Sequence, residues 1–80
     1  MNDDLHVDIE LDATGLNCPM PLLKLKQQLN KMQVGQVLRV RTSDGGSVRD
    51  FQAFVDQVGH GLLHHESNDS EFVFIIKKQR

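Results

Sequence analysis

The hydrophobic pattern of the chain changes period inside the segment Leu11-Asp12-Ala13-Thr14-Gly15-Leu16-Asn17-Cys18-Pro19-Met20-Pro21. Before it, residues 6–12 alternate between apolar and polar side chains, which predicts a half-buried β-strand. After it, apolar residues recur at helical spacing on one stripe, at Leu22, Leu25, Leu29 and Met32. Pro19 and Pro21 mark the helix start, because N–H groups in the first turn of a helix have no internal partner. The segment therefore predicts a strand, a short loop and a helix.

The remaining elements follow from the same two periods. Alternation predicts three more strands, at residues 36–42, 62–67 and 71–78. A second helix begins near Ser47, an N-cap residue followed by Asp50 in a weakened capping box. Gly59 is the expected end of that helix.

The order strand–helix–strand–helix–strand–strand predicts an α+β fold over residues 1–80, a single domain built as a two-layer α/β sandwich. Right-handed crossovers make the first strands parallel, and the final hairpin completes a four-stranded mixed sheet. Each helix has one apolar stripe, so we expect both helices on one sheet face and a polar second face.

Composition describes a small globular protein with 39% hydrophobic and 25% charged residues. No apolar run approaches the roughly 18 residues of a membrane span, and Met1 to Asp4 lack the features of a signal peptide. A lone cysteine cannot form an internal disulfide, which suits a reducing compartment. We therefore expect a cytoplasmic monomer that does not bind membranes.

Cys18, the one cysteine, lies just ahead of the first predicted helix. A helix N-terminus carries partial positive charge and free N–H groups, and both stabilise the nucleophilic thiolate. The position predicts an accessible thiol of lowered pKa, although free cysteine is also often a buried apolar residue. Protease-like and redox-sensor roles are disfavoured, because no histidine partner is placed by motif and no resolving cysteine exists. A group carrier needs only one exposed sulfur.

Other polar clusters give weaker signals. His60, His64 and His65 lie close in sequence, but adjacent strand residues point to opposite faces, so we expect no metal and no cofactor. Gly45-Gly46 precedes a helix without a phosphate-loop pattern, which favours a simple turn.

The basic residues do not predict a nucleic-acid surface. The net charge is -2, and the lysines of the first helix and the arginines of the second strand lie on opposite layers of the predicted sandwich. Met20 and Lys24 flank Cys18 instead, where an exposed methionine and a lysine are suited to contact a protein partner.

A Cys-Pro-x-Pro motif, Cys18 to Pro21, follows Gly15-Leu16, and further matches extend along nearly the whole chain, at residues 35–38, 44, 48–50, 54, 59–60 and the final hairpin. With the element order, these motifs resemble the TusA/SirA-like sulfur carrier family. The chain has Met20 where many members have an acidic residue. The same element order also occurs in the C-terminal domain of bacterial translation initiation factor three, so an RNA-binding or regulatory module is the alternative.

The resemblance implies a sulfurtransferase-like carrier rather than a stand-alone turnover enzyme. Cys18 would accept a sulfane sulfur from a cysteine desulfurase or rhodanese-like donor, hold it as a persulfide, and pass it to an acceptor protein for tRNA thiolation or other sulfur trafficking. The motif residues would shape the loop and the helix start: Gly15, Leu16, Asn17, Pro19 and Pro21. Three residues would contact partners: Met20, Lys24 and Asp44.

Overall fold

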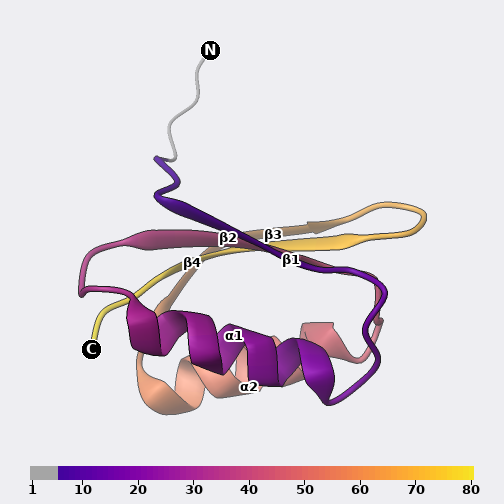
Figure 1. Cartoon of the computed structure of the whole chain (residues 1–80), viewed down its shortest axis with the longest axis horizontal. Helices are drawn as coiled ribbons and strands as arrows, with labels where there is room; N and C mark the ends of the chain where they lie inside the picture. Colours follow the sequence, from indigo (N-terminus) through magenta and orange to yellow (C-terminus); the bar gives the residue numbers. More distant parts are fainter. Residues whose placement is uncertain (1–5) are drawn as a thin grey trace.

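The computed structural model describes residues 6–80, and the acidic stretch Met1 to Asp4 lies outside the described residues. The chain forms four strands and two helices in the predicted order: β1 Ile9–Ala13, α1 Met20–Lys31, β2 Val37–Thr42, α2 Ser47–Val58, β3 Gly61–Ser67 and β4 Phe72–Lys77. Figure 1 shows the sheet as one layer and the two helices side by side beneath it. The predicted two-layer α+β fold is confirmed.

The sheet has the strand order β1-β2-β4-β3. β1 pairs in parallel with β2, and β4 lies antiparallel between β2 and β3. A register shift between Leu62 and His64 interrupts the β3–β4 ladder. No helix in the described part of the chain is long and apolar enough to cross a membrane.

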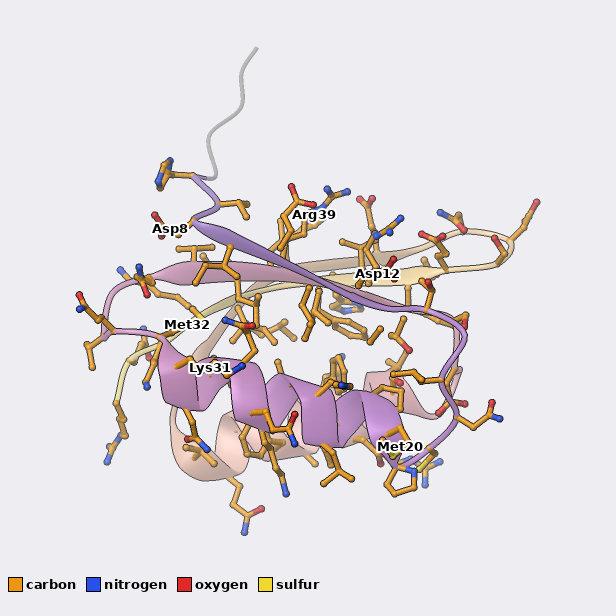
Figure 2. The ribbon with its side chains drawn as sticks, in the orientation of Figure 1. Asp8, Asp12, Met20, Lys31, Met32 and Arg39 are labelled. Atoms are coloured by element: carbon orange, nitrogen blue, oxygen red, sulfur yellow. The ribbon has the colours of Figure 1, made fainter. Side chains whose placement is uncertain are left out.

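The core lies between the helices and one face of the sheet. The predicted stripe of α1 supplies Leu25 and Leu29 to it, both almost fully buried, and Met32 continues the stripe beyond the helix end. Figure 2 shows Met32 in the space between α1 and the sheet. From α2, Phe51 packs its ring against Phe74 of β4, with the ring centroids 4.8 Å apart.

The second face of the sheet is charged at its edges and apolar along β4. Val73 and Ile75 point to this face yet are buried, and their register neighbours on β2 are Arg41 and Arg39. Long arginine stems cover apolar surface while the charged ends stay in water. Figure 2 shows Arg39 and Asp12 on this side of the sheet. The predicted polar face is therefore confirmed at β1 and β2 but includes an apolar centre.

The arginines of this face are ion-paired across the strands. Arg39 lies 3.4 Å from Glu10 of β1, and Arg41 lies 3.1 Å from Asp12 and 3.5 Å from Glu71. Figure 2 shows Arg39 on the opposite side of the sheet from Lys31 of α1, as the sequence predicted. The arginines of β2 and the lysines of α1 therefore do not form a continuous basic surface.

The predicted capping box at the start of α2 is wrong. Gly46 is the N-cap residue, Ser47 is the first residue of the helix, and the cap has no side-chain hydrogen bond. Ser47 is buried, and its hydroxyl hydrogen-bonds the Thr42 hydroxyl at 3.1 Å. Pairing two buried hydroxyl groups satisfies both of them, which accounts for the polar residue at this position.

The predicted helix stop at Gly59 is confirmed, since Gly59 has a left-handed backbone with φ of 96°.

Gly59→Ala should lower the free energy of unfolding by roughly 1–2 kcal/mol, because a Cβ disfavours this conformation. The new Cβ would also lie 2.7 Å from Arg80 Nε, which must move. Urea denaturation measures the loss. Gly45→Ala is the control, because its φ is not positive and its Cβ would meet only Phe72 at 3.9 Å. Equal stability of the two variants would contradict the argument.

Candidate functional site

The loop between β1 and α1 is held by hydrogen bonds on both sides of Cys18. Gly15 has a positive φ of 81°, and its N–H donates to Ser43 Oγ at 2.8 Å. The Met20 N–H donates to the Asn17 carbonyl at 2.8 Å, which closes a tight turn around Cys18 and Pro19. The Cys18–Pro19 peptide bond is cis.

The motif residues beside Cys18 divide between the core and the surface. Leu16 packs against the core, and Pro21 is buried in the first turn of α1. Pro19 is the N-cap residue, and its carbonyl accepts the Leu23 N–H at 3.1 Å. The loop is therefore anchored at both ends, and only its middle projects into solvent.

Cys18 is exposed, so the alternative of a buried structural cysteine is wrong. Its thiol donates to Asp50 Oδ2, with Sγ and the oxygen 3.4 Å apart. Asp50 lies in the first turn of α2, 32 residues further along the chain. The two helix starts, side by side in Figure 1, thus form a shared polar site.

The expected lowering of the Cys18 pKa is wrong. The hydrogen bond to Asp50 raises the pKa of the Cys18 thiol above its ordinary value, and partial desolvation and the charges of Asp50 and Asp44 act in the same direction. A carboxylate that accepts the thiol hydrogen stabilises the neutral form and repels the thiolate. In the free protein, the two carboxylates act against the stabilisation of a thiolate that the helix N-terminus was expected to give.

Asp44 forms the second acidic side of this site. Its carboxylate Oδ1 accepts the Gly46 N–H at 3.4 Å, while its Oδ2 is buried without a hydrogen-bond partner in the described part of the chain. The Gly46 N–H of the Gly45-Gly46 turn thus already donates its hydrogen bond to a carboxylate. Negative charge here disfavours a phosphate, in agreement with the prediction of a simple turn.

The first turns of α1, which follow Cys18 in the chain, carry exposed side chains. Met20 is 42% exposed and Leu23 is 43% exposed. Figure 2 shows Met20 at the start of α1. Lys24 is also exposed, one helical turn further along. The candidate docking residues Met20 and Lys24 are therefore both accessible, with Leu23 as an addition that the sequence did not single out.

The histidines do not gather into a metal site. His65 stacks on Phe74, and His64 hydrogen-bonds Glu66 on the other face of the sheet. His60 accepts the Gln79 N–H through Nδ1. Among residues 6–80, no three His, Cys, Asp or Glu side chains are placed to hold a metal ion.

His60 predicts a pH dependence of stability. Burial, with Lys78 and Arg80 nearby, lowers the pKa of His60 below its ordinary value of 6.5. The unfolded chain then binds a proton more readily than the folded chain, so stability should fall as the pH drops through that value. Urea denaturation at about pH 8 and about pH 5.5 measures the difference. In His60→Gln, the loss on acidification should be smaller than in the unmodified chain. If both chains lost equal stability on acidification, the pH dependence would come from groups other than His60.

Asp50 is the site residue that sequence reasoning missed. Its spacing from Ser47 suggested a capping role, and a capping role explains an acidic residue in a first helical turn without any contact to Cys18. The available signal was its place beside Val48 and Arg49 in the family-like pattern. Only the packing of α2 beside α1 brings its carboxylate to the sulfur.

Known proteins of similar sequence and structure include sulfur carriers. A family model described as sulfurtransferase TusA matches residues 9–78. The sulfur carrier protein TusA of Allochromatium vinosum is 52% identical over 71 residues, which cover 89% of this chain and 93% of that protein. A putative sulfur carrier protein of Neisseria meningitidis is 46% identical over 67 residues, 84% of this chain and 90% of that protein. The crystal structure of a SirA-like protein from Desulfitobacterium hafniense shares the fold, with a TM-score of 0.78 over 91% of this chain and 100% of that chain at 23% identity.

Proposed function

This chain belongs to the TusA sulfurtransferase family, and from that premise we propose that it carries sulfane sulfur as a persulfide on Cys18. Relatives named as sulfur carrier proteins match most of its length, which supports a sulfur-carrier role. The observation that carries the proposal is the placement of Cys18, exposed on an anchored loop between two helix starts. The chain has no second cysteine to compete for the sulfur.

Loading is an exchange between sulfur atoms. The Cys18 thiolate attacks the outer sulfur of a donor persulfide, a new S–S bond forms, and the donor's S–S bond breaks as its cysteine leaves as a thiolate. The thiol proton of Cys18 passes to solvent. In unloading, an acceptor thiolate attacks the outer sulfur and Cys18 leaves as a thiolate. The rates of both steps depend on thiolate fraction, leaving group and access.

A carrier needs a donor and an acceptor. We assign the donor to the cysteine desulfurases or rhodanese-like proteins, and the acceptor to a protein thiol in tRNA thiolation or another sulfur pathway. Met20, Leu23 and Lys24 form the surface that meets them, since an exposed apolar and cationic rim beside a reactive atom suits protein docking. The anchored loop changes little on docking, so little conformational entropy is lost. A free cysteine suits a reducing compartment, so we place the protein in the cytoplasm. We propose that it acts there as a monomer.

The test is intact-mass spectrometry after incubation with a cysteine desulfurase and L-cysteine. We expect a gain of one sulfur atom per chain, removed by dithiothreitol and mapped to Cys18. A chain that stays at its original mass with both a desulfurase and a rhodanese-like donor would reject the proposal.

The RNA-binding alternative is less well supported. Arg39 and Arg41 are paired with carboxylates, and the central aromatic rings Phe51 and Phe74 are buried rather than available for stacking on bases. Salt-dependent binding to RNA that persists when Cys18 is replaced would favour this alternative.

A further inference from the structure

We infer that Asp50 is a gate on Cys18: in the free protein its carboxylate holds the sulfur as a thiol, and the thiolate forms when a cationic group of an incoming reactant pairs with that carboxylate. This inference rests on the proposed function for its biological meaning, but its chemistry concerns only the thiol. It starts from the contact of 3.4 Å between Cys18 Sγ and Asp50 Oδ2 on the exposed side of the two helix starts.

Asp50 can restrain the thiol but cannot serve as its base. An ordinary aspartate is about five pK units more acidic than an ordinary cysteine. A hydrogen bond from a thiol to a carboxylate therefore leaves the proton on the sulfur. Asp50 can instead stabilise the thiol by accepting its hydrogen bond, and it can repel the thiolate by its charge. Neither effect requires proton transfer, and both raise the pKa of Cys18.

The charges that act on the sulfur indicate which reactants promote formation of the Cys18 thiolate. Asp50 belongs to α2 and Asp44 to the loop before it, and both raise the pKa of Cys18. The contact between Cys18 and Asp50 is on the exposed side of the molecule, so an incoming cation can reach the Asp50 carboxylate. A lysine or arginine placed beside Asp50 would pair with its carboxylate, neutralise the repulsion and release the thiolate. Reactants that bring a cation should therefore react faster than anionic reactants.

The first test is the pH dependence of Cys18 alkylation by iodoacetamide, which needs no partner protein. In Asp50→Asn the midpoint should move to lower pH, and the rate at neutral pH should rise about three- to tenfold, the increase in thiolate for a shift of half to one pK unit. Asp56→Asn is the matched control, since Asp56 is an exposed aspartate six residues beyond Asp50 on the same helix and is not among the charges that act on Cys18. A midpoint in Asp50→Asn that is no lower than in the control would overturn the inference.

The second test compares two small disulfides, cationic cystamine and anionic dithiodipropionate. In each reaction the Cys18 thiolate attacks one sulfur, a mixed disulfide forms, and the other half leaves as a thiolate, so atoms and electrons balance. At low salt the unmodified chain should prefer cystamine by about tenfold, within the range of electrostatic rate effects. This preference should shrink in Asp50→Asn and persist in Asp56→Asn. If Asp50→Asn kept the full preference for cystamine over dithiodipropionate, the proposed role of Asp50 would be wrong. Failure of persulfide loading with these results intact would instead reject the proposed function alone.

Discussion

Cys18→Ser should retain the fold and lose sulfur loading completely. The side chain is exposed and belongs to no core cluster, so the substitution removes no buried contact. A serine hydroxyl can still donate to Asp50, which preserves the one hydrogen bond that the thiol makes. It cannot form a persulfide, because no sulfur is left to take part in the S–S bond. Loading should therefore fall to the background of the assay.

The measurement for Cys18→Ser is radioactive sulfur transferred from labelled cysteine by a desulfurase, with circular dichroism and urea denaturation as folding checks. Ala53→Ser, at an exposed position of α2, is the control that adds a serine without removing the thiol. It should load like the unmodified chain. Label that stays bound to Cys18→Ser under non-reducing conditions would show that the sulfur is carried elsewhere.

The fold was predictable because its pattern is local. Strict alternation up to Asp12 and the stripe that begins at Leu22 each specify one element, and short connections leave few topologies. The central position of β4 could also be anticipated, since residues 72–76 are apolar on both faces of the strand. Such features need no knowledge of distant contacts.

The chemistry of the site was less predictable because it depends on a contact between distant residues. The helix start beside Cys18 correctly indicated an accessible thiol, but its protonation depends on Asp50, which α2 brings from 32 residues away. The prediction of Ser47 as an N-cap residue failed for the same reason, since its hydroxyl pairs with Thr42 of β2 instead of capping its own helix. Local propensities give way where tertiary packing offers a better partner.

Phe51→Ala should cause the largest loss of stability among the substitutions considered. Phe51 is fully buried, and its ring packs against Phe74. Removing a buried phenylalanine ring costs about 3–5 kcal/mol, from lost burial and the cavity left behind. A domain of this length has roughly 4–12 kcal/mol of stability in total, so the variant should be close to unfolded at 37 °C. Urea denaturation followed by circular dichroism measures the loss.

Two further variants separate the cavity from other effects of Phe51→Ala. Val34→Ala removes an apolar side chain that is 64% exposed and should change stability by less than about 0.5 kcal/mol. Phe51→Leu keeps much of the volume and should lose less than Phe51→Ala. Since Asp50 precedes Phe51 on α2, loosening this helix should also weaken the contact with Cys18 and raise thiol reactivity along with the stability loss. If Phe51→Ala instead matched Val34→Ala in urea, the packing of α2 on the sheet, and with it the position of Asp50, would have to be reassigned.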